Sequence, residues 1–284
     1  MLQHRNLKKI RIITRNMDYA ITFLGTAGGR SAVNNALRFS GGFILNFEGI
    51  QFHVDPGPGS ILNAAKFNVD LRNNNVILVS HNHLDHCNDL NHVIDVMTDS
   101  GREKRGILIT NKSVLFGNGE KPYLMKFYKN SLEKCYSLEH GKEAKVNNII
   151  IKALKTNHYD KTGIGFKFFT KKFVLSYTGD TEFSKEVVDE YKNSDILIIN
   201  NQNSFLGRGK TLSSKNSVDI INEVKPSLVL LTHFGSELIK NDPLYEAREI
   251  QKLTNIQTIA ARDGMVVEPL SYSPHLKQKN LYQY

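Results

Sequence analysis

The chain has 284 residues, of which 40% are hydrophobic and 23% charged, a composition typical of a globular protein with a large core. No apolar stretch approaches the roughly 18 residues of a membrane span, and no signal-peptide pattern is present. We therefore expect a cytoplasmic protein without membrane association. The two cysteines, Cys87 and Cys135, cannot form a disulfide framework, which agrees with a reducing compartment.

The net charge of +9 is unevenly distributed along the chain. Residues 1–18 contribute +4 of it, leaving +5 for the rest. The basic excess is compatible with a polyanionic partner such as RNA or DNA, although many proteins of similar charge bind neither. We expect residues 1–16 to be either a basic arm or a mis-assigned start. Residues 17–270 are predicted to form one compact domain, and residues 271–284 a polar tail.

Apolar runs predict many strands, and helical patterns lie between several of them. The expected strands are 19–24, 43–47, 50–54, 76–79, 106–109, 149–153, 165–169, 173–176, 196–199, 228–231 and 265–267. The expected helices are 61–67, 89–97, 185–192, 218–224 and 244–254. Glu48-Gly49 predicts a hairpin between two of the strands. The mixture of hairpins and crossovers indicates an α/β fold with two mixed sheets between layers of helices.

A motif rich in metal-ligand side chains follows the apolar run 76–79. It reads His81-Asn82-His83-Leu84-Asp85-His86, at the carboxyl end of a predicted strand. On an extended backbone, side chains two residues apart point the same way, so His81 and His83 converge. Asp85 and His86 follow as the chain turns, where they can serve a second ion. Three histidines and an aspartate within six residues would be an unfavourable loop without a cation, so the motif predicts metal binding.

Single ligand-type residues occupy the same kind of position further along the chain. His158, Asp180 and His233 each come soon after a predicted strand, and Asp55 ends another strand before Pro56-Gly57-Pro58-Gly59. The runs 76–81 and 228–233 are both apolar strands that end in a hydroxyl residue and a histidine, which indicates two related halves. We expect histidines 4, 53, 92 and 140 to be ordinary surface or core residues. Cys87 is either a thiolate ligand or, as we favour, a buried packing residue.

The order of these residues resembles the metallo-β-lactamase superfamily across residues 19–268. The runs 23–29 (FLGTAGG) and 261–265 (ARDGM) are similar to the ribonuclease Z-like branch, and especially to uncharacterised archaeal-type members of it. This resemblance implies a four-layer αβ/βα sandwich of two mixed sheets flanked by helices. It also implies a dinuclear metal site at one edge of the sandwich.

The resemblance implies a role for each ligand. His81, His83 and His158 would hold one metal ion, and Asp85, His86 and His233 the other. Asp180 would bridge the two ions, and Asp55 would orient a ligand histidine, so we expect Asp85, Asp180 and Asp55 to be the catalytic carboxylates. Imidazole and carboxylate ligands favour Zn²⁺, with Mn²⁺ or Fe²⁺ as alternatives. Two such ions roughly 3.5–4 Å apart would generate a bridging hydroxide from water near neutral pH.

The features that would contact a substrate are less specific. Backbone N–H groups of the glycine-rich segments 25–29, 41–42 and 57–59 suit a phosphate group, and Arg30 and Arg38 flank the first segment. The candidate phosphate contacts are thus Gly57, Gly59, Arg30 and Arg38. The alternative is that these glycines serve only tight turns beside the metal loop.

Departures from the ribonuclease Z pattern limit the substrate prediction. Only 21 residues separate His158 from Asp180, and 52 separate Asp180 from His233. These intervals leave no room for the substrate-binding arm of ribonuclease Z or for the large cap domain of related nucleases. The position of the branch's leaving-group histidine is occupied by Thr211, in the run Lys210-Thr211-Leu212-Ser213, and threonine is a poor general acid. Lys210 or water would then protonate the leaving group, unless that group departs unaided.

We therefore expect a dinuclear metal-dependent hydrolase, a phosphodiesterase or nuclease-like enzyme that acts on RNA, DNA or a smaller nucleotide. An alternative is a metal-dependent lactone, ester or thioester hydrolase. A second alternative is a nucleic-acid-binding subunit without enzymatic activity, although the complete ligand set disfavours it. A homodimer is compatible with the resemblance, but no segment identifies an interface.

Overall fold

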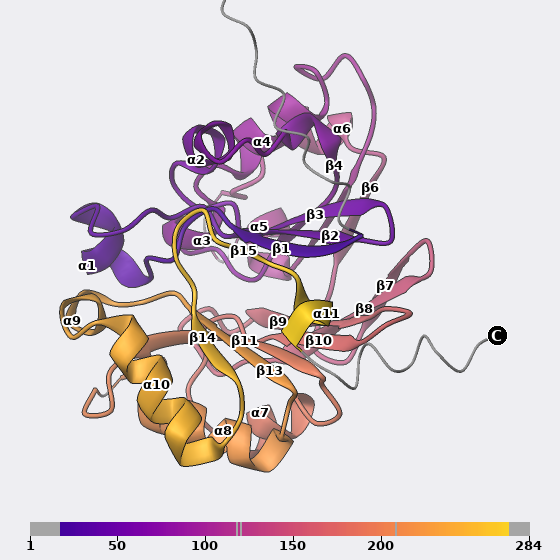
Figure 1. The fold of residues 1–284 in the computed structure, drawn as a ribbon. Helices are drawn as coiled ribbons and strands as arrows, with labels where there is room; N and C mark the ends of the chain where they lie inside the picture. Colours follow the sequence, from indigo (N-terminus) through magenta and orange to yellow (C-terminus); the bar gives the residue numbers. More distant parts are fainter. Residues whose placement is uncertain (1–17, 118, 120, 208, 273–284) are drawn as a thin grey trace, which may run out of the picture.

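The computed structural model describes residues 18–117, 119, 121–207 and 209–272 (Figure 1). Two sheets lie face to face in the middle of the molecule, and helices cover the outer face of each sheet. The fold class predicted from the sequence, two mixed sheets flanked by helices in four layers, is therefore confirmed. The predicted arm at residues 1–16 lies outside the described residues.

The first sheet contains seven strands. In order across the sheet they are β15 (Val266–Val267), β1 (Tyr19–Phe23), β2 (Phe43–Phe47), β3 (Ile50–Val54), β4 (Asn74–Val79), β5 (Ile107–Thr110) and β6 (Lys134–Ser137). The strands from β15 to β3 pair antiparallel, whereas β3, β4, β5 and β6 run parallel. The parallel part places the carboxyl ends of β3, β4 and β5 at one edge of the sheet.

The second sheet repeats this arrangement with seven strands in a row and one short strand beside them. In order they are β14 (Thr258–Ala260), β13 (Leu228–Thr232), β11 (Ile196–Asn203), β10 (Val174–Tyr177), β9 (Ile164–Phe169), β8 (Ile149–Lys155) and β7 (Glu143–Val146), with β12 (Leu212–Ser213) paired to β11. β14, β13, β11 and β10 are parallel, and the remaining strands of the row pair antiparallel. The parallel strands again bring their carboxyl ends to a common edge.

Helices cover both sheets and also line the edge that carries the strand ends (Figure 1). Outside the first sheet lie α2 (Ser60–Lys66), α4 (Leu90–Met97) and α6 (Lys126–Ser131). Side chains of η1 (Leu71–Asn73) and α5 (Lys112–Phe116) belong to the same apolar cluster as those of α2 and α4. Outside the second sheet lie α7 (Lys185–Glu190), α8 (Ser214–Val224) and α10 (Pro243–Thr254). The remaining helices are α1 (Gly29–Asn34), α3 (Leu84–Cys87), α9 (Ser236–Lys240) and α11 (Pro269–Tyr272).

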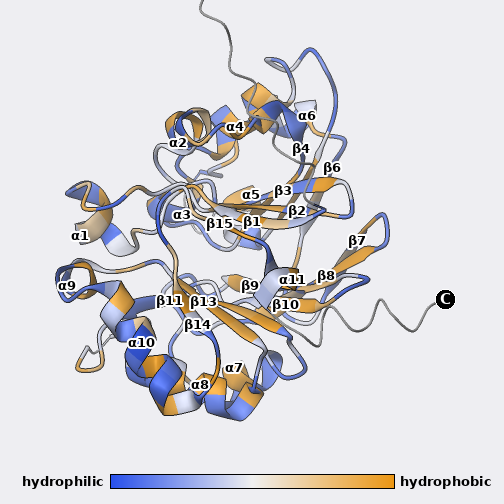
Figure 2. Ribbon diagram, in the orientation of Figure 1, coloured by the Kyte–Doolittle hydropathy of each residue, from blue (hydrophilic) through white to orange (hydrophobic). Residues whose placement is uncertain are grey.

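Three apolar clusters hold these layers together. The largest lies between the sheets, a second lies under α2 and α4, and a third lies under α8 and α10. Side chains of β4 alternate between the first two clusters, as do those of β13 between the first and the third. Because both faces of these strands are buried, their sequences are continuously apolar rather than alternating. Figure 2 shows the same arrangement, with hydrophobic strands in the interior and outer helices on which hydrophobic and hydrophilic residues alternate.

The β2–β3 hairpin joins at Glu48-Gly49, as predicted, with Phe47 opposite Ile50. Both turn residues have positive φ, 52° for Glu48 and 76° for Gly49, the combination of a type I′ turn. Glycine adopts this conformation without steric cost, which explains its place in the turn.

Every strand and helix predicted from periodicity is present. Most ends differ by one or two residues, but α8 begins four residues earlier and β11 ends four residues later than predicted. The short elements were not predicted: β6, β7, β12, β14, η1, α1, α3, α5, α6, α9 and α11. The predicted tail at 271–284 begins inside α11, and its residues 273–284 lie outside the described part. Among the described residues, no helix combines the length and the apolar character that crossing a bilayer requires.

Candidate metal centre

The strand ends of both sheets meet at one edge of the sandwich, and the predicted ligands lie there. β4 ends at Val79, two residues before His81, and the short helix α3 carries Asp85 and His86. Asp180 and His233 follow β10 and β13 of the second sheet. The two halves thus contribute to one cluster, as the repeated strand–hydroxyl–histidine pattern predicted.

The seven predicted ligands form three overlapping triads, within each of which the donor atoms lie within 4.8 Å of one another. The triads are His81–His83–His158, His81–His86–Asp180 and Asp85–His86–His233. Within them, His81 Nε2 is 2.9 Å from His83 Nδ1, and His86 Nε2 is 3.0 Å from His233 Nε2. Cys87 is not among these groups, because it is fully buried in the apolar cluster beneath α4.

Asp180 lies between the two ends of this cluster. Its Oδ2 atom is 3.5 Å from His86 Nε2 and 3.8 Å from His158 Nε2. Its Oδ1 atom is 3.5 Å from His233 Nε2 and accepts a hydrogen bond of 2.7 Å from Asn200 Nδ2. One carboxylate therefore faces histidines of all three triads, the position that a bridging ligand requires.

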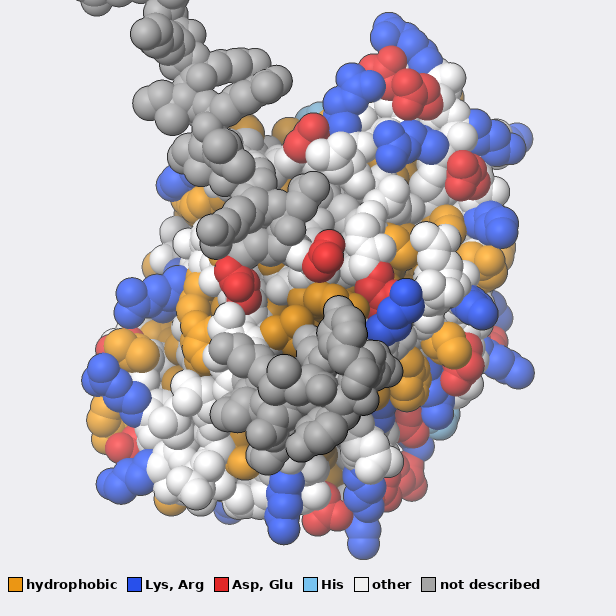
Figure 3. Space-filling model, turned by 45° about the vertical axis from the view of Figure 1, so that its right-hand side comes forward, with side chains coloured by type: hydrophobic (Ala, Val, Ile, Leu, Met, Phe, Trp, Pro, Cys, Tyr) orange, Lys and Arg blue, Asp and Glu red, His pale blue; other side chains and the backbone are white. Residues whose placement is uncertain are grey.

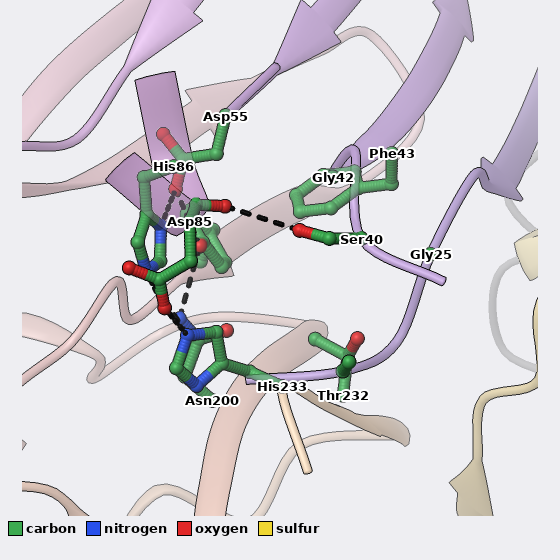
Figure 4. A pocket seen from close by; sticks show the side chains of 12 residues that line it. Gly25, Ser40, Gly42, Phe43, Asp55, Asp85, His86, Asn200, Thr232 and His233 are labelled. Atoms are coloured by element: carbon green, nitrogen blue, oxygen red, sulfur yellow. Dashed lines mark hydrogen bonds and ion pairs between the residues drawn. The ribbon is translucent and has the colours of Figure 1, made fainter. Parts of the chain in front are cut away.

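Asp55 lies behind the cluster and fixes the orientation of ligand-type side chains (Figure 4). Its Oδ2 atom lies 2.8 Å from His86 Nδ1 and accepts hydrogen bonds from Ser80 Oγ and Tyr177 OH, both at 2.7 Å. Its Oδ1 atom accepts a fourth hydrogen bond from the Ser80 backbone. The contact between Nδ1 and Asp55 turns the Nε2 atom of His86 toward the cluster.

Similar contacts orient the other ligand-type residues. The Lys210 carbonyl lies 3.0 Å from His158 Nδ1, which directs His158 Nε2 into the cluster. Ser80 Oγ lies 3.0 Å from His81 Nδ1 and has the same effect on His81. The backbone N–H of Gly29 donates to Asp85 Oδ2 at 3.0 Å, so the glycine-rich segment contacts the cluster through its backbone.

The backbone around the cluster is locally strained. Asp55 and His233 are not glycines, yet their φ angles are 51° and 60°. Residues in this region cost free energy and are frequent at functional sites. Gly28 packs tightly on the His233 ring, because a Cβ atom at this position would lie 2.1 Å from His233 Nδ1. That Nδ1 atom is buried and has no hydrogen-bond partner among the described residues.

Charge interactions in the cluster favour a cation. Burial alone would raise the pKa of Asp180, but His233 and His86 hold it well below its usual value. Burial would lower the pKa of His86, but Asp180, Asp85 and Asp55 raise it well above the ordinary value. Burial, together with the neighbouring His86, lowers the pKa of His81 well below that of a free imidazole. The cluster therefore combines charged carboxylates with a neutral His81, whereas His86 has to release a proton before its Nε2 atom can bind a metal ion.

These observations agree with a site for divalent metal ions. Imidazole nitrogens face each other at about hydrogen-bond distance, and the Nδ1 atoms of His86, His81 and His158 are turned to outside partners. Their Nε2 atoms face other imidazole nitrogens and two carboxylates. Such a cluster is costly without a positive charge at its centre, so the residues present fit divalent cations.

The predicted phosphate contacts are not gathered in one place. The Gly57 N–H already donates to the Asp55 carbonyl at 2.7 Å, and Gly59 is the N-cap of α2 with φ 83°. Arg38 donates to Thr26 and the Ala261 carbonyl, and its guanidinium lies 5.1 Å from the Phe234 ring centroid. Arg30 is exposed on α1. Arg38 therefore contacts the scaffold, whereas Arg30 is accessible to solvent.

Three residues near the cluster were not predicted. Tyr177 and Asn200 orient Asp55 and Asp180, and Asn200 also donates to the Tyr177 hydroxyl at 3.0 Å. Asp160 is buried and joins the loop after His158 to the metal motif through the Asn82 N–H. Asn200 follows the apolar run 196–199, a position in the sequence that resembles those of the ligand-type residues, but β11 continues through it to Asn203.

The fold and its histidine–aspartate cluster define a metallo-β-lactamase-fold hydrolase. The model of the β-lactamase superfamily domain matches residues 51–234, and the chain belongs to this family. It is similar to the uncharacterized protein MJ1374 of Methanocaldococcus jannaschii, with 34% identity over 259 residues, 90% of this chain and 97% of that protein. It is also similar to ribonuclease Z of Borreliella burgdorferi, with 21% identity over 89% of this chain and 97% of the relative.

Solved structures share the fold. The metallo-β-lactamase fold protein YhfI from Bacillus subtilis matches with a TM-score of 0.72 and 18% identity, over 88% of this chain and 98% of YhfI. A diphosphatase of the PhnP family matches with a TM-score of 0.65 and 16% identity, over 88% of this chain and 97% of that chain. The predicted resemblance to the metallo-β-lactamase superfamily is confirmed.

Proposed function

We propose that this protein is a dinuclear metal-dependent phosphodiesterase that acts on RNA, DNA or a smaller nucleotide. The observation that carries the proposal is the position of Asp180 between the overlapping triads of donor atoms. The similarity to ribonuclease Z supports phosphodiesters as the substrate class, because that relative is named for cleavage of RNA. The PhnP-family diphosphatase, which shares the fold, is named for phosphate chemistry as well.

In this proposal, His81, His83 and His158 would hold one ion, Asp85, His86 and His233 would hold the second, and Asp180 would contribute its carboxylate to both. Two divalent ions bound there would lower the pKa of water and neutralise charge on phosphoryl oxygens. Zn²⁺ suits the imidazole-rich donor set best, with Mn²⁺ or Fe²⁺ as alternatives. The free thiols of Cys87 and Cys135 are consistent with a reducing compartment such as the cytoplasm.

The surrounding residues position these ligands. Asp55 keeps the proton of His86 on Nδ1, and the Lys210 carbonyl does the same for His158. Asn200 holds Asp180 through its Oδ1 atom, which limits rotation of that carboxylate. Such preorganisation matters because ligands that are already oriented lose little freedom when an ion binds.

In this proposal, Lys210 or water donates the proton to the leaving group. The Thr211 hydroxyl accepts a hydrogen bond of 2.8 Å from Asn203 Nδ2, and threonine is not acidic enough to serve. The Lys210 ammonium lies 5.2 Å from the Tyr159 ring centroid, on the side of the cluster formed by His158. A substrate with a good leaving group would depend least on this step.

The test is hydrolysis of bis(p-nitrophenyl) phosphate, a thioester and a lactone, each with Zn²⁺ or Mn²⁺ supplied. We expect metal-dependent cleavage of the phosphodiester. Turnover of the thioester or lactone alone would instead place the protein among carbonyl hydrolases.

Asp180→Ala is the matched variant for this test. We expect it to abolish turnover and to lose one of the two metal ions, because no other described carboxylate lies between both ends of the cluster. The metal content of the purified variant is measured by mass spectrometry. Full activity with two bound ions would contradict the ligand assignment.

A further inference from the structure

An exposed aromatic ring adjoins the metal-ligand cluster. Tyr159 follows His158 directly and retains 64% of its accessible surface. Its ring centroid lies 5.3 Å from that of His158 and 6.5 Å from that of His83. A largely exposed ring beside the cluster leaves apolar, flat surface open to a ligand.

The loop that carries Tyr159 is firmly anchored although the ring is exposed. The next residue, Asp160, is buried, and its carboxylate accepts hydrogen bonds from five groups: Asn82 N, Asn111 Nδ2, Ser113 Oγ, Thr162 N and Thr162 Oγ1. On the other side, Asn157 N donates to Thr181 Oγ1 at 2.9 Å. The ring is thus presented from a fixed backbone, which lowers the entropic cost of binding a flat ligand against it.

A positive charge lies over the same ring. Lys210 Nζ is 5.2 Å from the Tyr159 centroid, and the Lys210 carbonyl is fixed by its contact with His158. An exposed ring with an ammonium group beside it matches a planar base linked to a phosphate. An acyl chain would gain nothing from the ammonium group, so the pair favours a nucleotide over a lipid-like substrate.

We propose that Tyr159 and Lys210 form a nucleotide subsite at the edge of the metal cluster, where Tyr159 stacks on a nucleobase of the substrate and Lys210 attracts the phosphate. This inference rests on the proposed phosphodiesterase function and names the part of the substrate that is recognised. Stacking on aromatic side chains tolerates any base, because each base has a π face. Tyr159 therefore selects for nucleosides rather than for a particular sequence.

The test compares methyl p-nitrophenyl phosphate with the p-nitrophenyl ester of thymidine 5′-monophosphate on the metal-loaded enzyme. Both substrates release the same leaving group, and only the second carries a base. The readout is the ratio of their kcat/KM values, because a loss of metal affects both substrates and cancels. We expect the wild type to favour the nucleoside substrate and Tyr159→Ala to lower that preference about tenfold. Tyr159→Phe keeps the ring and should keep the preference.

Two further variants sharpen the outcome. Lys210→Gln removes the charge but keeps the carbonyl that contacts His158, so it should lower kcat/KM for both substrates and preserve their ratio. Phe116, the last residue of α5, is the matched control because its side chain is also exposed, at 55%. It also has an ammonium group beside it, since Lys129 Nζ of α6 lies 5.0 Å from its ring centroid. Phe116→Ala should leave the ratio unchanged.

The results separate this inference from the function on which it rests. An unchanged ratio in Tyr159→Ala would overturn the subsite, as would an equal fall of the ratio in Phe116→Ala. Failure of the wild type to cleave either diester would overturn the proposed phosphodiesterase itself. As a direct check, thymidine 5′-monophosphate should inhibit cleavage of the methyl ester, with an inhibition constant that rises about tenfold in Tyr159→Ala.

Discussion

Asp55 shows how a residue outside the ligand set governs the cluster. Its carboxylate is contacted by four hydrogen-bonding groups, from Ser80, His86 and Tyr177, and so connects the metal motif of the first sheet to β10 of the second. The backbone of Asp55 is left-handed, with φ 51°, and its side chain points toward Ser80 and His86. The carboxylate therefore sets the tautomer of His86 and also holds the two halves together.

Asp55→Asn tests this role without a new backbone strain, because asparagine also tolerates a left-handed conformation. The amide NH₂ group cannot accept hydrogen bonds, so at least one of the four donors loses its partner. We expect the affinity for the metal ions to fall by 10- to 100-fold, measured by competition with a chelator. Tyr177→Phe removes a single donor and should have a smaller effect. Unchanged affinity in Asp55→Asn would disprove the orienting role.

His53 provides a pH-dependent contribution to stability away from the ligands. It is fully buried on β3, with Nε2 3.0 Å from the Gly41 carbonyl, and burial lowers its pKa from 6.5 to about 4. Between these values the unfolded chain binds a proton that the folded chain does not. The stabilising contribution is therefore complete above about pH 6.5 and is lost as the pH falls toward 4, at about 1.4 kcal/mol per pH unit.

We expect His53→Gln to reduce this acid sensitivity. Glutamine keeps a donor for the Gly41 carbonyl and does not titrate. The free energy of unfolding is measured with urea at several pH values from 4.5 to 7.5, on wild type and variant. The free energy of unfolding of the wild type should fall more steeply with falling pH than that of the variant, because only the unfolded wild type gains a proton at residue 53. Parallel pH profiles would show that His53 does not contribute.

At the scale of elements, the segment between β1 and α1 is a spacer whose small residues let two loops approach. The Gly28 N–H donates to the Phe234 carbonyl at 2.9 Å, and Ala27 forms an isolated bridge with Phe234. These contacts join the end of β1 to the end of β13. The glycine at 28 is needed for this approach rather than for its φ angle, which is −135°.

Gly28→Ala should therefore displace His233, because the new Cβ would lie 2.1 Å from His233 Nδ1 and 2.4 Å from its carbonyl oxygen. We expect loss of the ion assigned to Asp85, His86 and His233, whereas the ion assigned to His81, His83 and His158 should be retained. Metal content per chain is the measurement. Gly49→Ala is the control, since no atom lies within 4 Å of its added Cβ and only the positive φ is disfavoured. Two retained ions in Gly28→Ala would contradict the steric argument.

The elements also show what the sequence can predict. β4 and β13 are buried on both faces, so their apolar runs are evident, and the histidines that follow them were correctly placed at the strand ends. β6 and β14 are short strands without such runs, and β12 consists of two residues. Their pairing depends on neighbouring strands rather than on their own sequence, so local periodicity cannot reveal them.

In the candidate site as well, some residues can be identified from the sequence and others cannot. Ligand types such as His158 and Asp180 are identified by chemistry and by position after a strand. Tyr177 and Asn200 are ordinary residues of β10 and β11, and their contacts with Asp55 and Asp180 form only in the tertiary structure. The sequence therefore predicts the donor atoms, whereas the groups that orient them require the tertiary structure.

At the scale of the whole molecule, the basic excess is concentrated near the N-terminus. On the face shown in Figure 3, lysine and arginine side chains are interspersed with acidic ones rather than gathered in one field. Residues 1–18 carry +4 of the net charge of +9. The cluster that we propose for hydrolysis and the segment that we expect to attract nucleic acid are thus separate in sequence, and each can be altered alone.

Replacing the basic residues of the N-terminal segment by glutamine tests their role in the full-length chain; these are Arg5, Lys8, Lys9, Arg11 and Arg15. Each lost phosphate contact should flatten the dependence of log K on log salt by about 0.7 for single-stranded RNA. We expect weaker, less salt-dependent RNA binding and unchanged cleavage of methyl p-nitrophenyl phosphate.

The matched control replaces five exposed lysines of the body, Lys112, Lys126, Lys142, Lys145 and Lys252. Equal losses in both variants would mean that net charge alone attracts RNA. A different outcome would favour a non-enzymatic binding subunit: the N-terminal variant alone loses RNA binding, and Asp180→Ala acts on RNA as the wild type does.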